Sequence, residues 1–372
     1  MSWRYHNPVD VLFGAGTLDR LPEVVGGRKV VLVTFPEAAA LGLTARVTRL
    51  LGTALVGVIA DVEPNPDVEH LARLHARFWE ENPSCDVLVA VGGGSTLDTA
   101  KVLMVAPASG GFSELIRLLE HGETFEPGRV KALITVPTTA GTGSEVTPWA
   151  TVWDRSVNRK YSLHLRETWP ERAIVDPELT TTLPRAVTVQ GGLDALSHAL
   201  ESIWNVNANP VSDVLAVASA ALMIGTLPRL VENPDSIELR TSTSLAALQA
   251  GLAFSNTKTA LAHSISYEMT LRYGLPHGIA CSFTLPLVLE RAIGCSAERD
   301  RILARVFPCP LAEAPAYLQT FLETLEVSTR FEDYGVPESE SRRMIGDALA
   351  GPRGQNFIGS RPARGPSNGA GA

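Results

Sequence analysis

The sequence has little charge, few aromatic residues and few cysteines. Charged residues make up 19% of the 372 residues, aromatic residues make up 6%, and the formal net charge is −8. No block of Lys and Arg stands out, so the sequence gives little support to a nucleic-acid or membrane-surface role. A few local cations can still bind an anionic substrate inside an acidic protein.

Long apolar runs are also missing. No unbroken run reaches the roughly 18 residues of a membrane span, and residues 1–6 lack the apolar stretch of a signal peptide. The four cysteines form no CxxC pair and are too few for a disulfide framework in a chain of this length. We therefore expect a protein of the reducing cytoplasm, without membrane association.

What the sequence does contain is a regular alternation of strands and helices in its first half. We expect strands at 29–34, 55–59, 86–91 and 132–136. Helical stretches lie between them, one of them at 43–51 and another capped at its start by Asp67. Strands that alternate with helices predict a parallel α/β sheet.

The second half has a different pattern, with long helices expected at 193–204, 211–227 and 243–254. The simplest architecture is an α/β dinucleotide-binding domain (1–183) followed by an all-helical metal-binding domain (184–359), with the active site in the cleft between them. Residues 360–372 are rich in Gly, Pro, Arg and Ser, and we expect a disordered tail there.

Two loops have the composition of phosphate-binding sites. The first consists of Gly92, Gly93, Gly94 and Ser95, directly after a strand, and Asp98 follows in the first turn of the next helix. Glycine lets backbone N–H groups approach a phosphate closely. A tight turn is the alternative, but it does not require three consecutive glycines. The second loop, 137–145, follows another strand at the sheet edge where ligands bind.

A possible metal site lies in the helical half. Asp194 and His198 are four residues apart on one helix face, and Glu201 continues that stripe as a supporting partner. His263 is on a later helical stretch at 259–269, and His277 is in a loop between Pro and Gly. Three imidazoles and one carboxylate suit Fe(II) or Zn(II). Spacing alone leaves open that these are ordinary structural histidines.

The segments 92–95, 137–145, 194–201 and 275–278 together resemble the iron-containing (group III) alcohol dehydrogenase family, over about residues 5–358. The resemblance implies a dehydroquinate synthase-like architecture, with an α/β nucleotide-binding domain and a helical metal-binding domain. It implies that the metal ligands are Asp194, His198, His263 and His277. It also implies that the dinucleotide is contacted by Gly92 to Ser95, Thr138, Thr139, Thr142, Lys160 and Leu179, the last two on its ribose and adenine side.

Two positions depart from the family pattern. Many members have a histidine thought to assist proton transfer where this sequence has Tyr267, so we consider the phenol as an alternative proton donor. NAD-preferring members often have an aspartate after the first long strand, and Glu37 matches that position poorly. Either NADH or NADPH therefore fits the sequence.

Cations near the expected ligands suggest the substrate. Lys258 lies five residues before His263, Arg272 lies between the last two ligands, and Arg159 is a further candidate. A surface location is the alternative, but a cation in the cleft would hold an anionic group beside the aldehyde. The segments 262–267 and 356–359 resemble the phosphonoacetaldehyde reductase branch, which implies reduction of phosphonoacetaldehyde to 2-hydroxyethylphosphonate in phosphonate metabolism.

We therefore predict an iron-dependent, NAD(P)-linked alcohol dehydrogenase or aldehyde reductase, acting as a homodimer on a small anionic aldehyde. One alternative is a general short-chain alcohol or lactaldehyde dehydrogenase of the same family. A dehydroquinate-synthase-like lyase is more remote, because such enzymes lack the Asp194-x-x-x-His198 pattern. A non-catalytic metal- or nucleotide-binding protein would not need a complete ligand set together with two phosphate loops.

Overall fold

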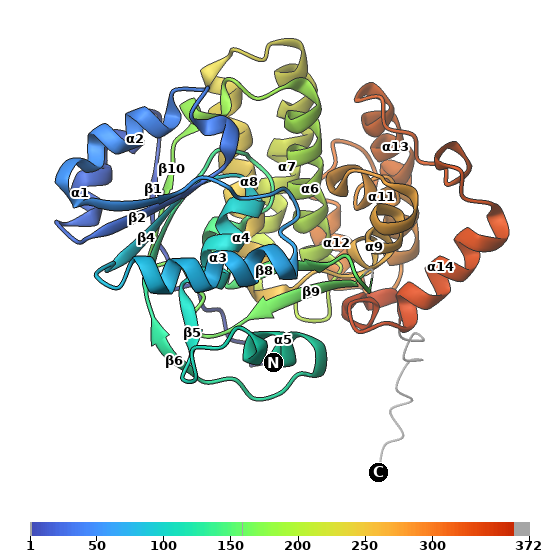
Figure 1. Ribbon diagram of the computed structural model, residues 1–372. Coiled ribbons are helices and arrows are strands. Elements are labelled where there is room, and N and C mark those ends of the chain that lie inside the picture. Colours follow the sequence, from blue (N-terminus) through green and yellow to red (C-terminus); the bar gives the residue numbers. More distant parts are fainter. Residues whose placement is uncertain (1, 158, 361–372) are drawn as a thin grey trace.

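The computed structural model describes residues 2–157 and 159–360, and the N-terminal half is built on a six-stranded parallel sheet (Figure 1). The strands lie in the order β1-β10-β7-β4-β2-β3. Their bounds are Asp10–Phe13 (β1), Val30–Thr34 (β2), Leu55–Ile59 (β3), Val87–Gly92 (β4), Ala132–Pro137 (β7) and Arg172–Val175 (β10). The four expected strands are confirmed as neighbours. The sequence reading missed β1 and β10, which are only four residues long.

Side chains of the inner strands alternate between two apolar layers. Val30 and Leu32 of β2 pack on one face with α1 (Leu21–Val25) and α2 (Leu43–Leu51). Val31 and Val33 pack on the other face with α3 (Val68–Glu81) and α4 (Gly94–Leu103). A parallel sheet covered on both faces needs such continuously apolar strands. The Asp67 carboxylate accepts a hydrogen bond from the Glu69 backbone N–H, so the predicted cap of α3 is confirmed.

Two antiparallel strand pairs extend the first half beyond the sheet. In one, β5 (Val105–Pro107) pairs with β6 (Pro127–Val130), and α5 (Ser113–His121) lies between them in sequence. In the other, β8 (Trp149–Asp154) pairs with β9 (Arg159–His164). Figure 1 shows β9 extending toward the C-terminal helices. This second hairpin carries side chains of the first half to the helical half.

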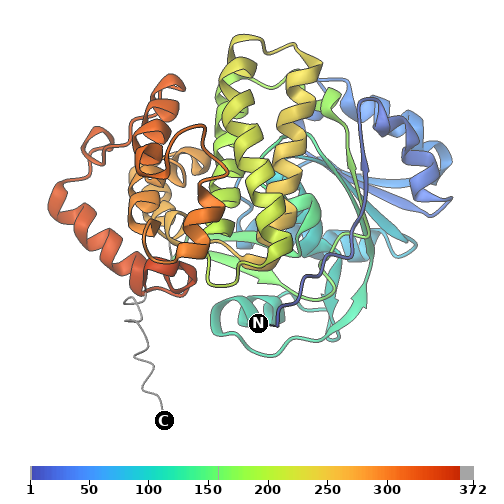
Figure 2. The same cartoon turned by 180° about the vertical axis from the view of Figure 1, so that it is seen from behind.

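Helices make up the second half, as expected. The three long helices α6 (Arg185–Ile203), α7 (Pro210–Glu232) and α8 (Ile237–Thr257) lie side by side in Figures 1 and 2. The remaining helices are α9 (Leu261–Tyr273), α10 (His277–Ala280), α11 (Leu285–Ala292), α12 (Ala297–Leu303), α13 (Ala314–Thr324) and α14 (Glu338–Ala350). His277 was expected in a loop but begins the short helix α10. Apart from Ser360, the expected disordered tail lies outside the described residues.

Helix α7 is long and apolar enough to cross a membrane, judged by length and composition alone. Its sequence contains no long unbroken apolar run, because Ser219, Gly225 and Thr226 interrupt the apolar residues. Half of its most apolar window is buried, and the helix packs against α6 and α8 in the main core of the helical half. A buried core helix of a folded domain passes the same test.

Candidate active site

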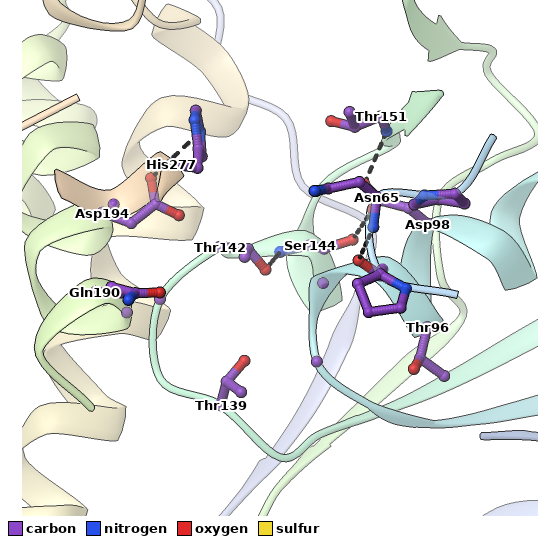
Figure 3. Close-up of a pocket in the computed structure, with 18 of the residues that line it drawn as sticks. Asn65, Thr96, Asp98, Thr139, Thr142, Ser144, Thr151, Gln190, Asp194 and His277 are labelled. Atoms are coloured by element: carbon purple, nitrogen blue, oxygen red, sulfur yellow. Dashed lines mark hydrogen bonds and ion pairs between the residues drawn. The ribbon is translucent and has the colours of Figure 1, made fainter. Parts of the chain in front are cut away.

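A large cleft separates the C-terminal edge of the sheet from the helical half. Its volume is about 1780 Å³, whereas pockets for drug-sized ligands are roughly 300–1,000 Å³. Figure 3 shows Thr139, Thr142 and Ser144 on the loop after β7, with Asp194 and His277 on the helical side. The cleft therefore has room for a dinucleotide together with a second molecule.

The two glycine-rich loops pack directly against each other. Gly92 at the end of β4 lies beside Pro137 at the end of β7, so both loops leave the sheet at the same edge. A Cβ atom on Gly94 would lie 2.7 Å from Cγ2 of Thr142, closer than real Cβ atoms approach other heavy atoms. Glycine at this position therefore allows the second loop to lie against the first turn of α4.

Buried polar groups hold the second loop in place. Lys101 of α4 donates hydrogen bonds to the backbone oxygen of Ser144 (2.6 Å), its hydroxyl (2.7 Å) and the backbone oxygen of Trp149 (2.8 Å). Asp98 accepts hydrogen bonds from the Ser144 hydroxyl and the Thr151 backbone N–H, both at 2.7 Å. Burial lowers the pKa of Lys101 to about 8. Asp98 lines the cleft, but its carboxylate is engaged in positioning this loop.

The four expected metal ligands meet in space. The imidazole Nε2 atoms of His198, His263 and His277 lie 3.7, 3.5 and 3.9 Å from Oδ1 of Asp194. Asp194, His198 and His263 are buried, while the side chain of His277 is 31% exposed and faces the cleft. Three elements, α6, α9 and the start of α10, supply these side chains. The fold thus brings together residues that are up to 83 positions apart (277 − 194).

Glu201 orients one of these imidazoles, as its position on the stripe suggested. Its carboxylate accepts hydrogen bonds from His263 Nδ1 (2.7 Å), the His263 backbone N–H (3.1 Å) and the Ala260 backbone N–H (2.9 Å). With its Nδ1 proton held by Glu201, His263 directs the lone pair of Nε2 toward Asp194. A carboxylate that fixes the outer nitrogen of a histidine is typical of metal sites.

The protonation states suit a cation at this position. Burial lowers the pKa of His198 to about 4 and the pKa of His277 well below its usual range. Burial acts to raise the pKa of Asp194, but the three facing histidines outweigh it and lower that pKa. At neutral pH Asp194 is therefore a carboxylate and His198 and His277 are neutral imidazoles, the forms that bind metal. Burial acts to lower the pKa of His263, but the Glu201 and Asp194 carboxylates outweigh it and raise that pKa. His263 Nε2 is buried without a hydrogen-bond partner within residues 2–157 and 159–360, so the donor set fits Fe(II) or Zn(II).

Three cations line the cleft that holds this cluster. The Lys160 ammonium lies 4.5 Å from the centre of the Tyr267 ring, and the Arg353 guanidinium lies 4.7 Å from the same centre. Lys258 follows α8 with a φ of +65° and also faces the cleft. Burial and the neighbouring Arg353 lower the pKa of Lys160 to about 8. In the described part of the chain, none of these cations has a carboxylate oxygen within ion-pair distance.

Some of the expected site residues lie elsewhere. Arg272 is nine residues after His263 on α9, two and a half turns at 3.6 residues per turn, and so lies on the opposite face. There it pairs with Glu268 and Glu340 outside the cleft, contrary to the expected substrate role. Arg159 is exposed and also outside the cleft, since side chains alternate along β9 and its neighbour Lys160 points inward.

Lys160 itself is at a different end of the cleft than expected. The resemblance placed it on the ribose and adenine side, whereas the structure places it beside Tyr267, where its charge also lowers the pKa of His277. The other expected cofactor residues line the cleft: Gly93, Gly94, Ser95, Thr138, Thr139, Thr142 and Leu179. Gly92 lies just before them, at the end of β4.

Several cleft residues were not identified from the sequence. Arg353 and Asn356 come from the segment after α14, and the Asn356 amide donates a hydrogen bond to the Thr259 backbone oxygen. The only sequence signal for this segment was the short resemblance at 356–359. Phe254 stacks on His198 with 4.0 Å between ring centres, and Trp149 stacks on Phe254 at 5.6 Å. These rings form an apolar wall beside the metal ligands.

Comparison with known proteins agrees with this geometry. The profile described as iron-containing alcohol dehydrogenase matches residues 8–177, and the profile of the family's C-terminal part matches residues 188–359. The chain belongs to the iron-containing alcohol dehydrogenase family. The expected fold class, a parallel-sheet domain with a helical domain in a dehydroquinate synthase-like arrangement, is confirmed by solved structures of the family.

Curated relatives include the NAD-dependent methanol dehydrogenase of Bacillus methanolicus, 35% identical over 66% of this chain and 63% of that protein. Long-chain-alcohol dehydrogenase 1 of Geobacillus thermodenitrificans is 36% identical over 69% of this chain and 65% of that protein. The matches thus span a little under two thirds of the length of these relatives.

Among solved structures, sulfoacetaldehyde reductase from Bifidobacterium kashiwanohense in complex with NAD+ has a TM-score of 0.88 and 27% identity, covering 96% of this chain and 95% of that one. A 1,3-propanediol oxidoreductase has a TM-score of 0.87 and 27% identity, covering 96% of both chains.

Proposed function

We propose that this protein is a metal-dependent, NAD(P)H-linked oxidoreductase that reduces a short aldehyde with an anionic group. The observation that carries the proposal is the set of three cations, Lys160, Lys258 and Arg353, that line the cleft holding the metal-ligand cluster, in a chain of net charge −8. Burial disfavours the charge of Lys160 and lowers its pKa to about 8, so an anionic ligand would stabilise the charged form. A neutral alcohol or aldehyde would leave these charges uncompensated.

Phosphonoacetaldehyde, with 2-hydroxyethylphosphonate as product, is the substrate we favour. A phosphonate carries up to two negative charges and three acceptor oxygens, which suits several cationic donors. Sulfoacetaldehyde is a second candidate, because one of the structurally similar proteins is a reductase of that aldehyde. Both aldehydes have two carbons, and the wall formed by Trp149 and Phe254 favours such a short chain.

In this proposal, Asp194, His198, His263 and His277 hold Fe(II) or Zn(II), and the loops 92–95 and 137–145 hold the phosphates of NADH or NADPH. When bound, the metal polarises the aldehyde oxygen and the reduced nicotinamide supplies the hydride. The protein's own side chains bind the anionic group and orient the aldehyde.

Tyr267 keeps its proton during this reaction. Burial raises the pKa of its phenol to about 12, so the hydroxyl is a hydrogen-bond donor and a weak acid at neutral pH. The Lys160 ammonium, with a pKa of about 8, is better matched to proton donation near neutral pH. We therefore propose that Tyr267 orients the substrate and that Nζ of Lys160 supplies the proton to the product oxygen.

The proposal is tested by assaying Fe(II)- and Zn(II)-loaded protein with NADH and NADPH against phosphonoacetaldehyde, sulfoacetaldehyde and propionaldehyde. We expect kcat/KM for an anionic aldehyde to exceed that for propionaldehyde by at least about 100-fold, equivalent to two charged hydrogen bonds of roughly 1.5 kcal/mol each. An equal or higher value for propionaldehyde would favour a general short-chain alcohol dehydrogenase.

We also propose that the enzyme is a cytoplasmic homodimer. All four cysteines are unpaired, which is compatible with that compartment.

A further inference from the structure

A sulfur atom lies within the cluster of expected metal ligands. Sγ of Cys281 is 3.5 Å from Oδ1 of Asp194. The donor atoms of Asp194, His263, His277 and Cys281 all lie within 4.8 Å of one another. Cys281 follows His277 by four residues, so one turn of chain beginning with α10 presents both side chains to the same point. The cluster therefore contains a fifth donor besides the four that sequence and family indicate.

The spacing of these atoms is that of ligands around one ion. Zinc binds thiolate at about 2.3 Å and imidazole or carboxylate at about 2.0–2.2 Å, so tetrahedral ligands are about 3.3–3.7 Å apart. Around Oδ1 of Asp194, the observed separations are 3.5 Å to His263 Nε2, 3.5 Å to Cys281 Sγ and 3.9 Å to His277 Nε2. These separations, with all four donor atoms within 4.8 Å of one another, would allow the atoms to bind one cation.

A second observation at the same point is the unsatisfied nitrogen of His263. Nδ1 of His263 lies 2.7 Å from the Glu201 carboxylate, which turns Nε2 toward Asp194. This Nε2 is buried, has no hydrogen-bond partner among the described residues, and faces the Asp194 carboxylate, which is itself an acceptor. A cation bound between them would contact both groups. The Cys281 thiol has one proton and two acceptors within hydrogen-bond distance, Asp194 and the Gly278 backbone oxygen, both at 3.5 Å.

We propose that Cys281 is a fifth ligand of the metal ion, besides Asp194, His198, His263 and His277. The inference rests on the proposed metal centre and adds a residue to it. On binding, a bond forms between Sγ and the ion, and the thiol proton leaves to solvent. A thiolate is a softer donor than an imidazole or a carboxylate, so this ligand shifts the preference of the site from Fe(II) toward Zn(II) and Co(II).

The test is optical spectroscopy of Co(II)-substituted protein. The metal is removed with a chelator, and one equivalent of Co(II) is added to wild type, Cys281→Ser, Cys85→Ser and His263→Ala. Cys85 is a matched control, since it is a buried free thiol in the sheet domain. We expect a sulfur-to-cobalt charge-transfer band in the near ultraviolet for wild type and Cys85→Ser. The band should be lost in Cys281→Ser, while the visible d–d bands and the bound Co(II) remain.

Zinc X-ray absorption of the wild type provides a measurement that does not depend on a variant folding. A sulfur scatterer at about 2.3 Å from zinc is expected, and a shell of only nitrogen and oxygen would overturn the inference. A charge-transfer band that persists in Cys281→Ser, or wild-type protein that binds Co(II) without the band, would also overturn it.

Failure of the metal centre itself has a different signature. In that case wild type would retain no stoichiometric Co(II), or His263→Ala would bind it as well as wild type does. Such a result would reject the proposed centre and the Cys281 ligand with it. Bound Co(II) without sulfur character would reject the Cys281 ligand alone.

Discussion

Replacing Arg353 with Met tests the proposed substrate class, because it removes a cleft charge and keeps an unbranched side chain. The Arg353 guanidinium stacks 4.7 Å from the Tyr267 ring centre and has no carboxylate partner in the described part of the chain. A hydrogen bond to a charged group contributes about 1.5–3 kcal/mol. Arg353 is partly exposed, so we take the lower part of that range, about 1.5–2 kcal/mol, which corresponds to a roughly 10–30-fold loss in kcat/KM.

The assay compares kcat/KM for phosphonoacetaldehyde and propionaldehyde in wild type, Arg353→Met and Arg353→Lys. The loss should be confined to the anionic aldehyde, and Arg353→Lys should recover part of it by keeping the charge. Lys258 is exposed, so Lys258→Met should cost only about 0.2–1 kcal/mol, at most about fivefold. Arg343→Met is the matched control, since Arg343 pairs with Glu268 and Asp347 outside the cleft.

Two results would refute this reasoning. Equal losses in kcat/KM with both aldehydes would mean that Arg353 stabilises the fold or binds the cofactor and does not bind the anionic group of the substrate. No loss with either aldehyde would mean that the anion binds elsewhere or that the substrate has no anionic group. Thermal unfolding of each variant separates the first outcome from simple destabilisation.

Three further predictions follow from other parts of the site. The Lys160 ammonium loses its charge as pH rises through its pKa of about 8. Above that pH, kcat should fall for both aldehydes because the proposed proton donor is lost, whereas KM should rise only for the anionic aldehyde; a parallel rise in KM for both would contradict the anion-binding role. Glu201→Gln weakens the hydrogen-bond acceptor that faces His263 Nδ1. Metal affinity should therefore fall about 10–100-fold in competition titrations. Unchanged affinity would show that Glu201 is dispensable. Gly94→Ala places a methyl group 2.7 Å from Thr142 Cγ2 and should raise the Kd for NADH about tenfold by overpacking, whereas Gly346→Ala, where nothing lies within 4 Å, should leave that Kd unchanged.

Trp149 and Phe254 stack in series against His198, and the Lys160 and Arg353 cations lie near the Tyr267 ring. Under the proposed function, the stacked rings would limit the length of the bound aldehyde and the cations would hold its anionic group.

The sequence by itself determined the elements whose signals are local. Local sequence patterns predicted the strands β2, β3, β4 and β7 and the helix cap at Asp67. Strand burial and helix capping depend on residues within a few positions of each other. The spacing of Asp194 and His198 likewise predicted a shared helix face, and the two glycine-rich loops were found from composition and position after strands.

Only the tertiary structure decided which distant side chains meet. Arg272 is close to the ligands in sequence but lies on the opposite face of α9, whereas Arg353, 76 residues after His277 (353 − 277), lies in the cleft. Lys160 reaches the metal end because the β8–β9 hairpin extends toward the helical half. Cys281 joins the cluster because residues His277 to Ala280 form the short helix α10. A four-residue helix is too short to produce a recognisable periodicity in the sequence. Contacts of this kind depend on packing between elements, which no local pattern encodes.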